Sequence, residues 1–383
     1  MAQQEYIAKT FLGLEEVLAE EIRALGADQP EVLNRAVKFY GDKAMLYRTN
    51  LNLRTALKVL VPIRKFTSSN EDDLYQAVYD YPWEQHFNLY NTFVIDGVVN
   101  SRIFKHSHFV ALKTKDAIVD RFRDKYNKRP SIDKNNPDFR INIHIYKDQC
   151  TLSLDSSGES LHKRGYKAKN VRAPLNEVLA AGLILLSDWD KASVFVDPMC
   201  GSATLPIEAA MIAHDIAPGW YRQNFGFETW HDFDHLLFQE LKNKCKPNAN
   251  AKSSPPIHGC DISKQTVETA QNNLEKAHLT KQVQLFNQSM AQYTPPAGEK
   301  GVVIMNPPYD QKIKEKDILA FYKNMGDVLK NKFDGYSVWI FSHHIKALKN
   351  VGLHPARKFT LFNGPLECKL QKYPMYKGSL KKK

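Results

Sequence analysis

The C-terminal part of the chain alternates short apolar runs with segments of helix length. Five of these runs have the length and composition of strands, at residues 193–196, 256–261, 283–286, 301–305 and 336–341. Strands that are separated by helices usually pair in parallel, because the helix carries the chain back along the sheet. From about residue 166 onward the pattern therefore predicts a doubly wound α/β sheet.

The first 165 residues follow a mixed pattern of helices and strands. An apolar helical repeat runs from Phe11 to Ile22 and stops near Gly26, and a helix is predicted at 43–50. A longer helix is predicted at 107–126, and the predicted strands lie at 37–42, 57–61, 92–99, 140–145 and 150–154. Together these patterns predict three domains, at 1–60, 61–165 and 166–383.

The charge of the chain favours a polyanionic partner. Its 383 residues include 53 Lys or Arg and 42 Asp or Glu, for a net charge of +11, which points first to nucleic acid. No apolar run approaches the roughly 18 residues that a membrane span needs, and the acidic start is unlike a secretory signal. The five cysteines lack C-x-x-C spacing, so neither a metal site nor a disulfide framework is expected. These features predict a cytoplasmic protein.

The basic excess is concentrated between residues 101 and 170. This segment has sixteen Lys or Arg and eight Asp or Glu, and it also has aromatic side chains that can stack on bases. A solvated, charge-dense face without a ligand is the alternative interpretation. The residues predicted to contact RNA are Lys113, Lys115, Arg121, Lys163, Arg164 and Tyr166.

The first strand of the α/β segment leads into a candidate cofactor loop. It ends in Asp197 and is followed by a small-residue turn at Gly201 and by a helix that begins near Pro206. A small side chain lets a ligand approach the backbone closely. A lone glycine beside an acid favours a cationic cofactor without phosphate, such as S-adenosylmethionine, whose amino group Asp197 would bind.

The ends of the next two strands supply further candidates for this cofactor. Asp261 is placed to accept hydrogen bonds from two ribose hydroxyls, and Ile262 to pack on the adenine ring. A capping role for Asp261 at the following helix is the alternative. After the third strand, Gln288 or Ser289 is the candidate contact for the adenine amino group.

The fourth strand ends in the sequence Asn306-Pro307-Pro308-Tyr309, which suits methyl transfer to an exocyclic amino group. The two prolines stiffen the turn, so that amide and carbonyl oxygens can be held toward an N–H2 donor. The ring of Tyr309 offers a face on which a base can stack. Read by itself, this motif is also an ordinary turn followed by a packed tyrosine.

Several longer strings resemble one protein family. They are Lys115 to Asp120, Arg129-Pro130, Leu154 to Tyr166, Ala173-Pro174-Leu175, Asp197 to Thr204 and Asn363 to Cys368. They are similar to the THUMP-containing class I RNA methyltransferases that form N2-methylguanosine, in particular the large-subunit rRNA enzymes called RlmL. The resemblance covers nearly the whole chain. It implies a ferredoxin-like unit, a THUMP domain that holds RNA, and a Rossmann-like domain that uses S-adenosylmethionine.

Position by position, the resemblance assigns a site. The catalytic residues would be Asn306, Pro307, Pro308 and Tyr309. The cofactor-binding residues would be Pro174, Leu175, Asp197, Met199, Gly201, Thr204, Asp261, Ile262, Gln288, Ser289 and Asn306. Relatives often have Asp where this chain has Gln288, so the adenine contact departs from the family's pattern. No metal is implied.

The resemblance predicts formation of N2-methylguanosine in 23S rRNA, and it leaves three alternatives open. These are a tRNA guanosine-N2 methyltransferase, a DNA amino-methyltransferase and a non-catalytic RNA-binding assembly factor. Some bacterial relatives carry a second, fused methyltransferase. The chain ends at Lys383, so that second half is not expected here.

Overall fold

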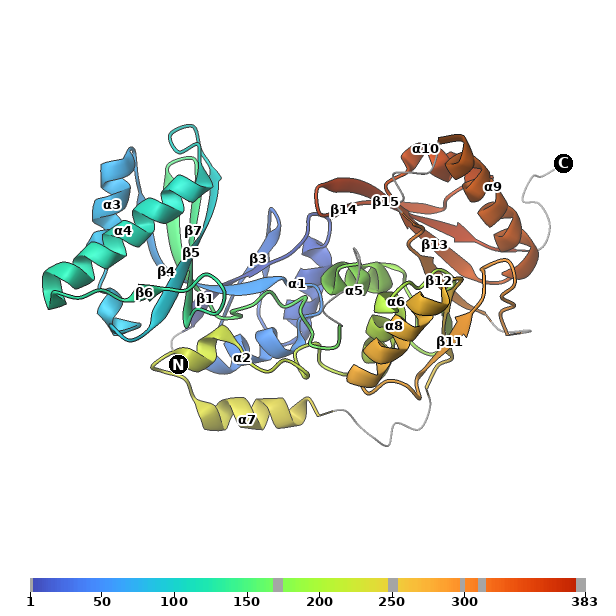
Figure 1. Cartoon of the computed structure of the whole chain (residues 1–383), viewed down its shortest axis with the longest axis horizontal. Helices are drawn as coiled ribbons and strands as arrows, with labels where there is room; N and C mark the ends of the chain where they lie inside the picture. The colour runs from blue at the N-terminus through green and yellow to red at the C-terminus, as the bar shows by residue number, and fades with distance from the viewer. Residues whose placement is uncertain (1–2, 168–174, 247–253, 297–299, 309–314, 377–383) are drawn as a thin grey trace. The chain divides into compact units, whose positions relative to one another are not determined.

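The computed structural model describes residues 3–167, 175–246, 254–296, 300–308 and 315–376 (Figure 1). The chain separates into two compact units. Unit one consists of residues 1–10, 21–161 and 222–244, and unit two of residues 11–20, 162–221 and 245–383. The domain boundaries expected near residues 60 and 165 stay predictions.

Unit one is built on an eight-stranded sheet in the order β2-β3-β1-β4-β8-β7-β5-β6. The strands are β1 (Gln4–Lys9), β2 (Glu31–Leu33), β3 (Ala36–Gly41), β4 (Lys58–Thr67), β5 (Thr92–Asn100), β6 (Ser131–Ile132), β7 (Phe139–Tyr146) and β8 (Gln149–Asp155). β4 pairs with β1 on one side and with β8 on the other. The sheet is therefore continuous through β4.

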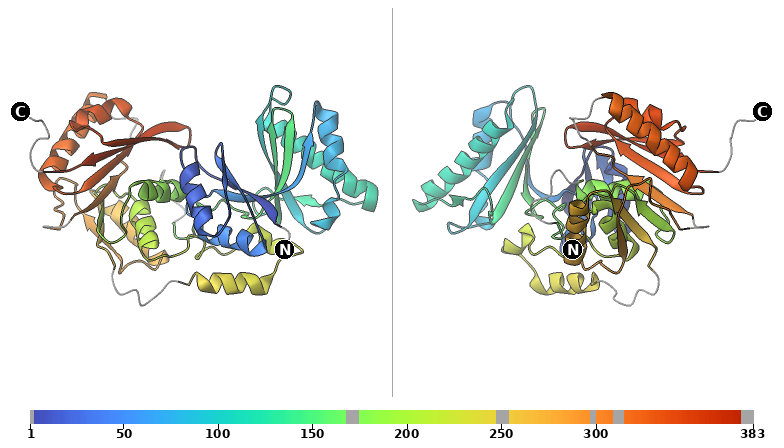
Figure 2. Two further views of the ribbon diagram at one scale, coloured as in Figure 1. Left: turned by 180° about the vertical axis from the view of Figure 1, so that it is seen from behind. Right: turned by 45° about the vertical axis from the view of Figure 1, so that its right-hand side comes forward.

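Helices α3 (Glu71–Tyr79) and α4 (Ser107–Tyr126) lie together against one face of this sheet (Figures 1 and 2). Phe139, Ile141, Ile143 and Ile145 of β7 are all buried, and the residues between them are more exposed. This period of two directs one face of β7 into a core that includes Phe122 of α4. α4 ends at Asn127, which adopts the left-handed conformation of a C-cap.

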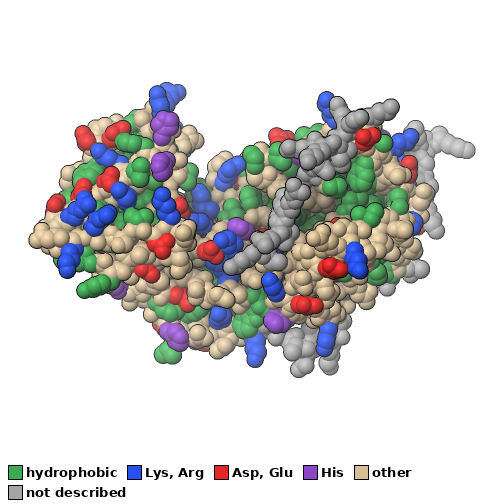
Figure 3. Space-filling model, viewed as in Figure 1, with side chains coloured by type: hydrophobic (Ala, Val, Ile, Leu, Met, Phe, Trp, Pro, Cys, Tyr) green, Lys and Arg blue, Asp and Glu red, His purple; other side chains and the backbone are tan. Residues whose placement is uncertain are grey.

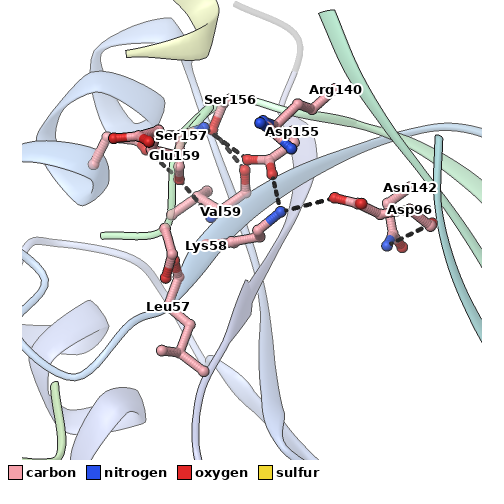
Figure 4. Close-up of polar contacts among 12 residues, drawn as sticks. Leu57, Lys58, Val59, Asp96, Arg140, Asn142, Asp155, Ser156, Ser157 and Glu159 are labelled. Atoms are coloured by element: carbon pink, nitrogen blue, oxygen red, sulfur yellow. Dashed lines mark hydrogen bonds and ion pairs between the residues drawn. The ribbon is translucent and has the colours of Figure 1, made fainter. Parts of the chain in front are cut away.

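A buried ion pair joins β4 to β8 (Figure 4). The ammonium group of Lys58 lies 2.7 Å from Oδ2 of Asp155 and 3.1 Å from Oδ2 of Asp96 on β5. Asp155 is 2% exposed, and Ser157 N–H donates to its Oδ1. Burial raises the pKa of the Asp155 carboxyl, although Lys58 opposes this. Burial lowers the pKa of Lys58, but the two carboxylates outweigh it, so the net shift is upward.

Among its described residues, unit one has four further helical elements and part of a fifth. They are α2 (Lys43–Asn52), η1 (Trp83–Gln85), η2 (Gly226–Thr229) and α7 (His235–Lys244), while α1 (Glu15–Ala24) runs from unit two into unit one. The guanidinium of Arg222 donates to the carbonyl oxygens of Ser157, Glu159 and Ser160. These hydrogen bonds fix the backbone of part of the motif from Leu154 to Tyr166, so that part has a structural role.

Unit two is a seven-stranded sheet in the order β11-β10-β9-β12-β13-β15-β14. Its strands are β9 (Val194–Asp197), β10 (Ile257–Asp261), β11 (Val283–Asn287), β12 (Gly301–Met305), β13 (Ser337–Ser342), β14 (Arg357–Asn363) and β15 (Leu366–Pro374). The first five in spatial order pair in parallel, which confirms the predicted sheet. β15 and β14 pair antiparallel at the edge, and this hairpin was not predicted.

Helices cover both faces of the second sheet (Figure 1). α5 (Glu177–Leu186), α6 (Thr204–Ala213) and α8 (Lys264–Lys276) share one core with Ile304 of β12. α9 (Glu315–Lys332) and α10 (Ile345–Leu348), which is followed by η3 (Lys349–Val351), share the other core with the neighbouring Val303. Because adjacent strand residues face opposite cores, the central strands are apolar throughout. Among the described residues, no helix is long and apolar enough to cross a membrane.

Candidate functional site

Three polar residues end adjacent strands of the second sheet. Asp261 ends β10, Asp197 ends β9, and Asn306 directly follows β12. β9 lies between β10 and β12, and the chain moves from β9 to β10 and β11 before it returns to β12 on the other side. This reversal is a topological switch point, where open α/β sheets bind their ligands.

The loop after β9 is fixed by hydrogen bonds to the end of β10. Gly201 N–H donates to Oδ2 of Asp261 over 3.2 Å, and Cys200 N–H donates to the carbonyl oxygen of Cys260 over 2.8 Å. Behind the loop, the side-chain amide of Asn273 donates to the carbonyl oxygen of Ser202 over 3.0 Å. The loop is therefore held in place by the next strand and by α8.

The electrostatics of this loop disfavour negative charge. Asp197 is 2% exposed, and burial raises the pKa of its carboxyl to about 8. The charge of Asp261 adds to the shift, whereas Met199 N–H donates to Oδ1 of Asp197 over 3.1 Å and opposes it. Burial also raises the pKa of the Cys260 thiol to about 12. A cation placed here would favour the charged form of the Asp197 carboxyl.

The shape of the loop leaves room for a ligand. Gly201 has a φ of +54°, and a Cβ built on it would meet no atom within 4 Å. Beside Asp261, the side chain of Ile262 is 77% exposed. An open backbone turn, two carboxyl groups and an exposed aliphatic side chain fit a cofactor that combines a cationic end, a ribose and a flat base.

Ser263, and not Asp261, caps the helix that follows β10. The N-cap of α8 is Ser263, whose side chain accepts from Thr266 N–H. Asp261 accepts from Ser263 N–H over 2.9 Å through Oδ1, while its Oδ2 accepts from Gly201. The carboxyl of Asp261 therefore organises the ends of both β9 and β10.

The side chains after β11 are engaged within the chain. Asn287 donates from its amide to the carbonyl oxygens of Asp261 and Ile262, each over 3.1 Å. Gln288 is half-buried and forms a hydrogen bond with the thiol of Cys260. Ser289 Oγ donates to Gln292 Oε1 over 2.9 Å. Asn287 thus braces the turn that presents Ile262.

The candidate target-base motif begins at the end of β12. Asn306 is partly exposed, Pro307 is buried and Pro308 is exposed. Tyr309 lies outside the described residues, as does Pro174. Leu175 is 8% exposed and precedes Asn176, which caps α5 by accepting from Val178 N–H and Leu179 N–H. Thr204, which is buried, begins α6 two residues before the predicted start.

Comparisons with known proteins identify the family. Residues 164–372 match the RMKL-like methyltransferase domain, residues 68–155 the THUMP domain and residues 5–60 the RlmL ferredoxin-like domain. The putative RNA methyltransferase slr0064 of Synechocystis is 38% identical over 97% of this chain and 97% of its own length. The chain belongs to the RMKL-like methyltransferase family. The predicted Rossmann-like, THUMP and ferredoxin-like architecture is thereby confirmed.

Two further relatives of this RMKL-like methyltransferase are informative. The ribosomal RNA large subunit methyltransferase K/L of Syntrophotalea carbinolica is 38% identical, and this chain spans about half of that relative, 53% of its length. The crystal structure of SMU.472, a putative methyltransferase complexed with S-adenosylhomocysteine, is 30% identical with a TM-score of 0.87 and covers 99% of this chain and 100% of its own. The RMKL-like methyltransferase is therefore an S-adenosylmethionine-dependent enzyme, as predicted.

The structure contradicts two of the predicted RNA contacts. The side chains of Arg164 and Tyr166 are 1% and 0% exposed, so neither lies at a surface that RNA can reach. Tyr166 OH donates to Oε1 of Glu208 on α6 over 2.9 Å, and Nε of Arg164 lies 3.5 Å from the same oxygen. The motif that contains them forms a buried ion pair beneath α6.

The other predicted RNA contacts are accessible to different degrees. Lys163 is exposed. Lys113 and Lys115 are 27% and 28% exposed, and they pair with Asp72 and Asp116 respectively. Figure 3 shows Lys and Arg side chains spread over the α4 part of the surface, with Asp and Glu among them. Arg121 is held by Glu84 in a bidentate ion pair of 2.9 and 2.8 Å.

Two features of the site were not predicted from the sequence. The rings of His343 and His344, immediately after β13, lie with their centroids 3.7 Å apart. The brace from Asn273 to the cofactor loop was also missed. The histidine pair could have been found from the sequence. It follows a predicted parallel strand, and ligands bind beyond the carboxyl ends of such strands. Among the described residues, no group of His, Cys, Asp and Glu is arranged to hold a metal ion.

Proposed function

We propose that this RMKL-like methyltransferase transfers a methyl group to the exocyclic N2 of a guanosine in RNA, and that its substrate is 23S rRNA. One observation carries the proposal. The pairing of β10, β9 and β12 sets Asp261, Asp197 and Asn306 at the same edge of one sheet, at its switch point. The names of the K/L relatives and the matched THUMP domain support rRNA as the substrate.

In this proposal the chain's own groups bind and orient the two reactants. Asp197 holds the amino group of the cofactor, Asp261 accepts from its ribose hydroxyls and Ile262 packs on its adenine. Pro174, Leu175, Met199, Gly201 and Thr204 border the methionine part, and Gln288 and Ser289 border the adenine. Bound S-adenosylmethionine supplies the electrophilic methyl group.

The target base is held by the motif after β12. The side-chain oxygen of Asn306 and the carbonyl oxygen of Pro307 accept the two N2 hydrogens, which turns the nitrogen lone pair toward the methyl group. Pro307 and Pro308 stiffen this turn, and Tyr309 stacks on the base after it leaves the RNA stack. No general base is needed if the amine loses its proton after transfer.

The RNA is held by basic side chains of the segment between residues 101 and 170. Lys113, Lys115 and Lys163 contact phosphates, and Arg121 of α4 holds Glu84. We place the ferredoxin-like domain at 1–60, the THUMP domain at 61–165 and the methyltransferase domain at 166–383. An rRNA substrate would place the enzyme in the cytoplasm. Methylation of a tRNA guanosine is the alternative substrate.

Nucleoside mass spectrometry tests this function. rRNA and tRNA from a deletion strain are digested, and their N2-methylguanosine is compared with that of strains complemented by the parent chain or by Asn306→Ala. We expect N2-methylguanosine to disappear from large-subunit rRNA alone and to return only with the parent. Purified Asn306→Ala should lose turnover by orders of magnitude and keep nearly all of its affinity for S-adenosylhomocysteine.

Asp261→Ala is the matched variant for the cofactor side of the site. It should weaken S-adenosylhomocysteine binding by about 1 to 3 kcal/mol, because a partly buried acceptor is lost. A loss of N2-methylguanosine from tRNA alone would favour the alternative substrate. An Asn306→Ala enzyme that methylates at the parent rate would remove Asn306 from the catalytic role.

A further inference from the structure

The two histidines after β13 reach the same sheet edge as the target-base motif. β13 pairs in parallel with β12, and Ile340 lies opposite Met305. Asn306 follows Met305 at the end of β12, and His343 follows Ser342 at the end of β13, so both segments leave the sheet at its carboxyl edge. Neighbouring strands are about 4.8 Å apart, so the histidine pair borders the place where the fourth strand delivers its ligands.

The conformation of this segment is fixed by packing against α9. His344 N–H donates to Oγ of Ser342 over 3.0 Å, and Tyr322 of α9 shares a 2.6 Å hydrogen bond with the same hydroxyl. The His344 ring lies edge-on to the Tyr322 ring at 6.4 Å. The His343 ring packs against that of His344, tilted by 42°. The position of the His344 ring is therefore set before any ligand arrives.

One atom of this cluster needs a partner. The side chain of His344 is only half-buried, unlike those of Arg164 and Tyr166, and its Nε2 has no hydrogen-bond partner among the described residues although that atom is shielded from solvent. Buried polar atoms are nearly always paired, because an unpaired one has lost its water without compensation. Burial also lowers the pKa of His344, so its ring is neutral near pH 7, with one ring nitrogen as a donor and the other as an acceptor. Nε2 is the acceptor in the tautomer that carries the proton on Nδ1.

Guanine has a hydrogen-bond donor, N1–H, beside the amine, where an acceptor such as Nε2 of His344 could bind it. Next to its N2 amine, guanine carries the N1–H donor, whereas the ring nitrogen next to the N6 amine of adenine, N1, is an acceptor. An acceptor beside the bound amine therefore favours guanine. A motif that binds only an amino group cannot distinguish guanine from adenine, because both bases have one.

We propose that His344 is a specificity-determining residue whose Nε2 accepts the N1–H of the target guanine, with His343 packed on its ring as a positioning residue. This inference rests on the proposed function, since it assumes a base whose amine is held by Asn306. It adds the group that selects the base, which the Asn-Pro-Pro-Tyr motif does not supply.

The test compares two bases at the mapped target nucleotide of a synthetic RNA. One RNA carries guanine and the other 2-aminopurine, which keeps the amine but lacks N1–H. We expect His344→Ala to lower kcat/KM for guanine about tenfold to a hundredfold, as for a lost buried hydrogen bond, and to change the value for 2-aminopurine little. His344→Gln, which keeps an acceptor, should recover part of the preference for guanine.

The control is His354→Ala, which removes an exposed histidine outside the site and should match the parent on both RNAs. S-adenosylhomocysteine affinity checks that each variant is folded, and if His344→Ala loses it, His344→Gln carries the comparison. An equal loss on both RNAs, or no loss on guanine, would overturn the role of His344. A parent enzyme that forms no N2-methylguanosine would instead overturn the proposed function.

Discussion

At the scale of single residues, Asp197 links cofactor binding to pH. The pKa of its buried carboxyl is about 8, against an ordinary value of 3.8. Between these values the folded protein binds a proton that the unfolded chain does not, so Asp197 lowers stability as the pH rises. A bound ammonium group has the opposite effect on Asp197, because it stabilises the deprotonated carboxylate. Binding of a cationic cofactor should therefore release a proton.

We predict that the affinity for S-adenosylhomocysteine rises by about tenfold per pH unit between about pH 5.5 and 7.5. Calorimetry in buffers of different ionisation enthalpy measures both the affinity and the number of protons released. Asp197→Asn cannot release a proton, so its weaker binding should stay flat across the same range. Parent affinity that is flat or falls with rising pH would show that Asp197 does not face the ammonium group.

The polar strand ends could be predicted from sequence, whereas the fate of Arg164 and Tyr166 could not. An acid that follows a short apolar run has a defined place at a sheet edge, so Asp197 and Asp261 were found by local pattern. A basic and aromatic string has the same composition whether it meets RNA or a buried carboxylate. Its partner Glu208 is 42 residues beyond Tyr166, a distance that no local pattern spans.

At the scale of elements, the ion pair between β4 and β8 should stabilise unit one. Lys58→Ala leaves the buried Asp155 without its nearest cation, which should lower the free energy of unfolding by about 3 kcal/mol. We take the lower end of the usual range because Lys58 is 27% exposed. The loss should shrink at acid pH, since burial already raises the pKa of Asp155 and protonation removes the unpaired charge.

Urea unfolding of the full chain at two pH values measures this loss. Lys65→Ala is the matched control on the same strand, because Lys65 is 57% exposed and pairs with Glu5 at the surface. An exposed pair of this kind contributes about 1 kcal/mol or less. Equal losses for Lys58→Ala and Lys65→Ala would mean that the buried pair does not stabilise the β4–β8 junction.

The elements with strong periodicity were predicted, and those with mixed signals were missed. The predicted strand at 301–305 and the predicted helix at 107–126 coincide with β12 and α4. The β14–β15 hairpin was missed although Asn363-Gly364 is a turn signal and Gly364 has a φ of +60°. Its strands carry lysines among their apolar residues and form an antiparallel edge, so they lack the continuous apolar run of a central parallel strand.

At the scale of the whole molecule, the net charge of +11 should make RNA binding depend on salt. If Lys113, Lys115 and Lys163 contact phosphates, replacing all three with Ala removes three sites of counterion release. The slope of log affinity against log salt concentration should then become shallower by about 2, at the roughly 0.7 per contact expected for single-stranded RNA. Filter binding of an rRNA fragment between about 50 and 200 mM salt measures this slope.

The matched control loses the same charge elsewhere, by replacing the exposed Lys244, Lys276 and Lys281 with Ala. Both triple variants lose the same net charge, which acts on any polyanion at long range. Only the loss of direct phosphate contacts can therefore make the salt slopes of the two variants differ. If both variants make the slope equally shallower, the RNA responds to net charge alone and the proposed phosphate contacts are wrong. A shallower slope confined to the variant that lacks Lys113, Lys115 and Lys163 would assign phosphate contacts to these lysines, with S-adenosylhomocysteine affinity unchanged in both variants.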